Sequence, residues 1–132
     1  MIGRSTIKAD RSDTIARHND AFRKALKTTL TPDGLVRGRV VVTRSVHDLP
    51  EQVYLAAVQM TRLECQFGTE NDPYGEHDFG SFSVKGLGQD LETTFFWKID
   101  YYADDSLEWG SNEPERLSAT YRVLTLMLPE DY

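Results

Sequence analysis

The sequence predicts an α+β fold in which two helices pack on one face of a mainly antiparallel, twisted sheet. Two segments, near residues 10–28 and 49–63, repeat apolar residues at helical spacing. After residue 78 the pattern changes to stretches rich in aromatic and β-branched residues, which is typical of strands. The resulting order is a helix, a strand, a helix and then three or four meander strands.

The chain before the first helix shows no apolar periodicity. Residues 1–9 are therefore expected to form a flexible arm, and residues 10–132 a single α+β domain, which suits a chain of 132 residues. Asp10, Ser12 or Asp13 can cap the helix, because short polar side chains accept hydrogen bonds from its first free N–H groups.

The strands are expected at places marked by turn signals and β-branched runs. The first follows Thr-Pro-Asp-Gly at 31–34 and contains three consecutive valines at 40–42, which predicts burial on both faces. The second helix then opens at Pro50, with Asp48 as its cap. The expected strands cover residues 38–46, 78–84, 93–101 and 120–128, with a shorter one at 107–109.

Side-chain sizes predict how the two aromatic strands pair. If paired residue numbers add up to 177, Gly80 lies under Trp97, and an indole that covers a strand glycine compensates for the missing side chain. The same register places His77 opposite Asp100. A shift by one residue would set Asp78 against Asp100, and two facing carboxylates repel each other. We therefore predict the first register.

The stretch at 71–82, Asn-Asp-Pro-Tyr-Gly-Glu-His-Asp-Phe-Gly-Ser-Phe, is the densest in ionisable and turn-forming groups. In the predicted register Asp100 orients the His77 ring as a general base, and Lys98 can hold an anionic group. This arrangement would suit a hydrolase or a nucleic-acid-processing enzyme. In the alternative interpretation these ionic groups only close the end of the sheet. No nucleophile accompanies them in the sequence, so we favour a protein that is not an enzyme.

The same stretch offers Glu76 and Asp78 as candidate ligands of a divalent metal. Successive strand residues point to opposite faces, so Glu76, His77 and Asp78 converge only if the strand is irregular. His-x-His and Cys-x-x-Cys spacings are absent from the sequence, and we expect neither a metal nor a cofactor. A third interpretation is purely conformational, with a loop at 71–75 that reverses the chain after the second helix.

The net charge of −6 hides a separation of charge along the chain. Residues 1–62 carry a balance of +5 and residues 63–132 a balance of −11. Either the two halves form layers that attract each other, or an acidic face is left free for a partner with a basic surface. We expect that partner to be a protein. The expected binding residues are Asp104, Asp105, Glu108, Asn71, Asp72 and Tyr74.

Other partners and compartments fit the sequence less well. The basic residues of the first helix have no interleaved aromatic side chains, which makes nucleic acid a less favoured partner. No apolar run is long enough to cross a membrane. The lone cysteine, Cys65, excludes an internal disulfide and is consistent with a reducing cytoplasm.

Three motifs carry a resemblance to a known family. They are the stretch at 71–82, Phe-Phe-Trp-Lys-Ile-Asp-Tyr-Tyr at 95–102 and Tyr-Arg-Val-Leu-Thr-Leu-Met-Leu at 121–128, and Asn-Asp-Ala-Phe-Arg at 19–23 adds to them. Over about residues 15–132 the chain resembles the bacterial family called domain of unknown function 3768.

The resemblance implies an uncharacterised protein typical of alphaproteobacteria and often encoded on plasmids or other mobile elements. It implies no catalytic or binding residue, because none is established for the family. It also implies that an accessory or counter-defence role should be considered, in which exposed carboxylates bind a basic partner. We therefore expect a small acidic cytoplasmic protein that binds another macromolecule through its acidic C-terminal half. The alternative is the hydrolase that uses His77 and Asp100.

Overall fold

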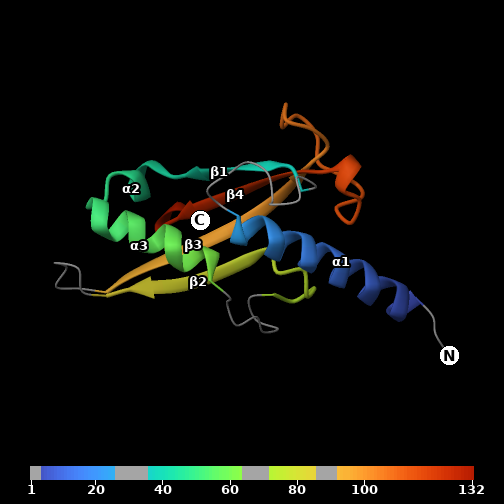
Figure 1. The fold of residues 1–132 in the computed structure, drawn as a ribbon, viewed down its shortest axis with the longest axis horizontal. Helices are drawn as coiled ribbons and strands as arrows, with labels where there is room; N and C mark the ends of the chain where they lie inside the picture. The colour runs from blue at the N-terminus through green and yellow to red at the C-terminus, as the bar shows by residue number, and fades with distance from the viewer. Residues whose placement is uncertain (1–3, 26–35, 64–71, 86–91) are drawn as a thin grey trace.

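The computed structural model describes residues 4–25, 36–63, 72–85 and 92–132. Within these ranges three helices and one strand occupy the first half of the chain, and strands dominate the second half (Figure 1). The elements are α1 Arg4–Lys24, β1 Gly38–Val42, α2 Arg44–His47, α3 Glu51–Arg62, β2 Phe79–Val84, β3 Thr93–Tyr102, the 3-10 turn η1 Leu117–Ala119, β4 Tyr121–Met127 and the 3-10 turn η2 Pro129–Asp131.

The described residues form a four-stranded sheet with the order β1-β4-β3-β2. Strands β2, β3 and β4 make an antiparallel meander, and β1 lies parallel to β4 at one edge. Helices α1 and α3 lie over the same face of this sheet (Figure 1). The predicted α+β fold, with helices on one face of a mainly antiparallel sheet, is therefore confirmed.

The predicted register of the aromatic hairpin is also confirmed. Gly80 pairs with Trp97 and Phe82 with Phe95, and the rings of the second pair stack 5.4 Å apart. Trp97 is fully buried beneath the helices, where it joins Phe22 of α1 in one hydrophobic core. Because side chains alternate along a strand, this register sends the intervening residues of β2 and β3 to the opposite, helix-free face.

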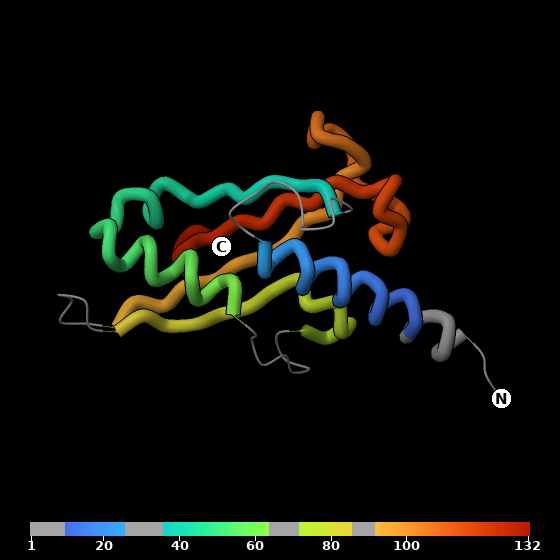
Figure 2. Tube along the Cα trace, viewed as in Figure 1, coloured from blue at the N-terminus to red at the C-terminus, as the bar shows by residue number. Residues whose placement is uncertain are grey.

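The first helix begins earlier than the sequence indicated. It starts at Arg4 and ends at Lys24, so the helix start expected near residue 10 and the caps expected at Asp10, Ser12 and Asp13 were wrong, while a flexible arm at residues 1–9 stays a prediction. Neither glycine nor proline interrupts this stretch, and weak amphipathicity does not stop a helix once a neighbouring turn is formed. The C-terminal part of α1 lies over the sheet (Figure 2), and the helix as a whole projects past the end of the sheet toward its N-terminus (Figure 1).

The strand expected at 38–46 is shorter than predicted. β1 ends at Val42, and Arg44–His47 form the single helical turn α2. Since β1 is an edge strand, Val41 keeps 39% of its surface exposed, and burial of the three valines on both faces was also wrong. Asp48 ends α2 rather than capping α3, whose N-cap is Pro50.

The short strand expected at 107–109 does not form. The chain makes only an isolated bridge between Tyr102 and Gly110, and Leu107 takes a left-handed conformation with φ of 59°. A left-handed residue cannot belong to a regular strand, so this segment is a loop.

Candidate functional site

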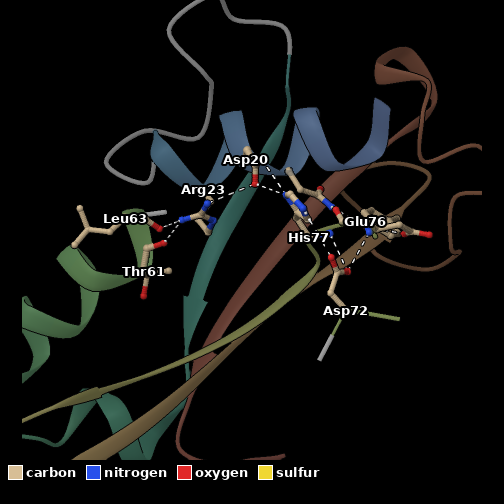
Figure 3. A network of polar contacts seen from close by, with 9 residues as sticks. Asp20, Arg23, Thr61, Leu63, Asp72, Glu76 and His77 are labelled. Carbon is tan, nitrogen blue, oxygen red and sulfur yellow. Dashed lines mark hydrogen bonds and ion pairs between the residues drawn. The ribbon is translucent and has the colours of Figure 1, made fainter. Parts of the chain in front are cut away.

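One polar side of α1 is buried against the loop that precedes β2 (Figure 3). Arg23 is only 1% exposed, and its guanidinium donates to the carbonyl oxygens of Thr61, at 3.0 Å, and Leu63. The same group lies 5.4 Å from the centre of the Trp97 ring and 3.5 Å from a carboxylate oxygen of Asp20. A buried guanidinium needs such partners, because an unpaired charge in the interior is costly. Arg23 therefore joins α1 to the end of α3.

Asp20 extends this network to His77. Nδ1 of His77 lies 3.1 Å from both carboxylate oxygens of Asp20, and its Nε2 lies 3.8 Å from Asp72. Asp72 in turn accepts hydrogen bonds from the backbone N–H groups of Glu76, at 3.0 Å, and His77, at 3.1 Å. Gly75 and His77 both have positive φ, 68° and 56°, so the loop turns back on itself twice. The imidazole is thus held between two carboxylates.

The pairing of His77 with Asp100 that the sequence predicted is wrong. β2 begins at Phe79, and the left-handed conformation of His77 breaks the regular alternation before the strand starts. Its ring turns toward α1 and meets Asp20, while Asp100 forms an ion pair with Lys98 at 3.1 Å. The base and orienting group of the proposed hydrolase are therefore not brought together.

A second branch of the network joins α1 to β3 and β4. The fully buried amide of Asn19 donates to the carbonyl oxygen of Glu76, at 3.0 Å, and to the hydroxyl of Tyr101, at 2.8 Å. Its oxygen accepts a hydrogen bond of 2.7 Å from Nε of Arg122, and Tyr101 donates to the Glu76 carboxylate at 3.1 Å. Burial raises the pKa of Tyr101 well above its ordinary value and lowers the pKa of Arg122 to about 10. Both groups stay protonated at neutral pH, which indicates a structural role.

A cleft opens on the helix-free face, beside the start of β2. It has a volume of about 530 Å³ and is lined by Asp78, Lys98 and Asp100 together with the rings of Tyr74 and Tyr132. Asp78 is half-buried, and its pKa is raised to about 6 by that burial and by the nearby carboxylates of Glu76, Asp72 and Asp100. The sequence indicated separate roles for these residues, with Tyr74 as a binding residue, Lys98 as a holder of an anionic group and Asp78 as a metal ligand, and the structure brings all three to one cleft.

A second accessible feature is the loop at residues 103–110, which we call the acidic loop. Asp104 accepts hydrogen bonds from the backbone N–H of Ser106, at 2.9 Å, and from its hydroxyl, at 2.5 Å. These bonds hold the pKa of Asp104 below its ordinary value. Asp105 and Glu108 are also exposed, and none of the three acids forms an ion pair with another described residue. Trp109, at the end of the loop, is 74% exposed.

Trp109 is the residue that sequence reasoning missed. An exposed indole is unusual on a protein surface, because burying an aromatic ring is one of the larger gains of folding. The available signal was a tryptophan inside a turn-forming, acidic segment that lacks strand alternation.

Comparison with known families identifies the chain. A family described as protein of unknown function (DUF3768) matches residues 42–131. The chain belongs to this family. The match is narrower than the resemblance suggested, since it starts at the end of β1 and leaves α1 outside. No curated protein and no solved structure matches the chain.

The remaining predicted site residues of this DUF3768 protein fall into different places. Asn71 lies outside the described residues. Asp72 is buried and accepts hydrogen bonds from its own loop, and its expected role in binding stays a prediction. Over the ranges that the structure describes, no three histidine, cysteine or acidic side chains are arranged to hold a metal, although Glu76 and Asp78 lie close together. Within the same ranges no helix has the length and apolarity needed to cross a membrane.

Proposed function

We propose that this DUF3768 protein binds a basic segment of another protein through its acidic loop. The observation that carries the proposal is the exposed indole of Trp109 beside three exposed carboxylates, Asp104, Asp105 and Glu108, which form no ion pair with another described residue. Tryptophan is among the residues that contribute most to binding at protein interfaces. Its ring also attracts the cationic groups of lysine and arginine, which the carboxylates pair with directly.

The loop is held in shape without a partner. The backbone N–H of Ala103 donates to the carbonyl oxygen of Trp109 at 2.8 Å, and that of Ser111 donates to Tyr101 at 3.0 Å. The bonds from Ser106 to Asp104 fix the turn between them. A surface that is already ordered loses less conformational entropy on binding, which supports a recognition role.

Charge supports a basic protein partner over nucleic acid. The balance of −11 in residues 63–132 repels phosphates and attracts lysine and arginine side chains. Two neighbouring arginines pair with acids outside the acidic loop, Arg11 of α1 with Glu115 at 2.5 Å and Arg116 with Glu113 at 2.9 Å. Among the described residues, none forms an ion pair with the acids of the loop, which supports their availability to a partner. The proposal places this binding in a bacterial cytoplasm, as an accessory or counter-defence function of a mobile element, which the resemblance supports.

A panel of capped peptides rich in lysine and arginine tests the proposal, with glutamine versions of the same peptides as the neutral comparison. Binding is followed through the fluorescence of Trp109 and by calorimetry at low ionic strength. Changing Asp104→Asn, Asp105→Asn and Glu108→Gln together is expected to weaken the best peptide about tenfold or more, and added salt to weaken the wild type. Trp109→Ala is expected to have an effect of similar size.

The matched control is a triple change that alters net charge equally at exposed acids elsewhere. Asp10→Asn, Asp13→Asn and Glu92→Gln serve this purpose, because all three side chains are exposed and lie outside the acidic loop. Equal weakening by both triple variants would show only a long-range charge effect and would contradict a specific site. Binding that survives Trp109→Ala and the loop triple variant at full strength would also contradict it.

A further inference from the structure

The cleft on the helix-free face has features of a ligand site that the acidic loop does not share. Its volume of about 530 Å³ falls within the range of small-molecule pockets. Two tyrosines line it and remain largely exposed, Tyr74 at 67% and Tyr132 at 77%. The ring of Tyr132 is fixed by edge-on contacts with Phe79 and Phe96, at 5.7 and 6.1 Å between ring centres. This wall of the cleft is therefore preformed.

The charges in the cleft do not balance. Lys98 is its cationic side chain, and its Nζ lies 3.1 Å from Asp100. Asp78 forms no ion pair with another described residue and is surrounded by the carboxylates of Glu76, Asp72 and Asp100. A half-buried carboxylate among other carboxylates is unfavourable unless a cation compensates it. Nothing among the described residues supplies that cation to Asp78.

We propose that this cleft binds a small organic molecule through an ammonium or guanidinium group, which pairs with Asp78 and is flanked by the rings of Tyr74 and Tyr132. A carboxylate pair and aromatic faces are the groups that recognise such cations. The aromatic walls would cover the alkyl part of the ligand. This inference is independent of the proposed function, because it uses none of the residues of the acidic loop.

The raised pKa of Asp78 adds a measurable consequence. A cation that pairs with the carboxylate favours its ionised form, so binding lowers the pKa of Asp78 from about 6 and releases a proton near that pH. The charged groups that act on Asp78 are Glu76 and Asp72 of its own loop and Asp100 of β3, and Lys98 of β3 lines the same cleft. Among these, the acids raise the pKa of Asp78 in the free protein.

The test uses n-butylguanidinium as the probe and n-butylurea as its neutral counterpart of the same shape. Binding is measured by chemical-shift titration of the whole chain, and the pKa of Asp78 by its side-chain carbon signal. The cation is expected to bind about tenfold more tightly than the urea, and Asp78→Asn to remove that preference. Lys98→Met is expected to strengthen binding about threefold, because it removes a competing cation and frees Asp100.

Asp105→Asn, on the acidic loop, is the control and is expected to leave this binding unchanged. Equal affinity for the cation and the urea, weaker binding by Lys98→Met, or an Asp78 pKa that does not fall on binding would each overturn the proposal. A capped arginine peptide that binds more tightly than n-butylguanidinium and loses this advantage in Asp78→Asn would overturn the small-molecule assignment in favour of a polypeptide side chain. If this test fails, the proposed binding of a basic protein segment by the acidic loop is unaffected. If the test of the acidic loop fails, the proposal for the cleft is likewise unaffected.

Discussion

The indole of Trp97 occupies the space that a side chain at Gly80 would need. A Cβ placed on Gly80 would lie 2.5 to 2.6 Å from three atoms of the indole, closer than such atoms approach in real proteins. The two residues are directly paired in the β2–β3 hairpin. The absence of a side chain at Gly80 is thus what lets the largest buried ring of the core approach the backbone of β2 so closely.

Gly80→Ala is expected to destabilise the fold. The added methyl group must push the buried indole aside, and overpacking of this kind costs about 1–3 kcal/mol in the free energy of unfolding. Urea unfolding measures the change. Gly110→Ala is the control, because its Cβ would approach no closer than 3.7 Å to a neighbouring atom, the carbonyl oxygen of Tyr101. Equal loss of stability in both variants would contradict the role of the indole.

Asn19→Ala is expected to be among the most destabilising polar changes in the chain. It removes three hydrogen bonds at once and leaves the guanidinium of Arg122 buried without its amide partner. The expected loss in the free energy of unfolding is about 3 kcal/mol. Asn112→Ala, at an exposed position, is expected to cost less than about 0.5 kcal/mol. A small effect at Asn19 would show that water readily replaces its bonds.

Asp78 gives the stability a pH dependence of definite sign. Its pKa in the folded chain is raised from 3.8 to about 6, so the folded state holds a proton that the unfolded state has lost between these values. The free energy of unfolding therefore falls as the pH rises through this window. Asp78→Asn abolishes this fall and is expected to stabilise the protein at about pH 7.5 by about 1 kcal/mol, once solvent screening is allowed for.

The measurement is urea unfolding of wild type and Asp78→Asn at about pH 7.5 and at about pH 3.5, where the advantage of the variant should vanish. Asp105→Asn, at an exposed carboxylate, is expected to show no such difference between the two conditions. A constant gap between wild type and Asp78→Asn at both pH values would contradict the raised pKa. A stable Asp78→Asn variant also makes its loss of cation binding interpretable.

The parts of the fold that follow from local pattern were predictable from the sequence. The aromatic strands and their register were predictable, because the alternation of side chains along each strand and the fit of the Trp97 ring over Gly80 leave one favourable pairing. The parallel pairing of β1 with β4 was not, since a parallel neighbour far along the chain leaves no turn signal. The start of α1 at Arg4 was missed because residues that can cap a helix, such as Asp10 and Ser12, also occur inside helices.

The candidate site was predictable in its location but not in its contacts. The stretch at 71–82 does hold the polar loop, but the partner of His77 is Asp20, which lies 57 residues away in sequence. No local rule predicts the left-handed conformation of His77 that turns its ring toward α1. The segment at 19–23, quoted only for its resemblance, supplies Asn19, Asp20 and Arg23 to the network.

The two tryptophans are expected to report different environments. Trp97 is fully buried and Trp109 is 74% exposed, so the wild-type emission should contain a component that acrylamide quenches readily and one that it does not. Trp109→Phe is expected to remove the quenched, longer-wavelength component and to change the free energy of unfolding by less than about 0.5 kcal/mol. Acrylamide quenching of both proteins, with the unfolded chain in urea as the fully exposed reference, makes the comparison. If the emission of Trp109→Phe is quenched as readily as that of the wild type, the indole of Trp109 is not displayed on the acidic loop, and the binding surface proposed there loses its central residue.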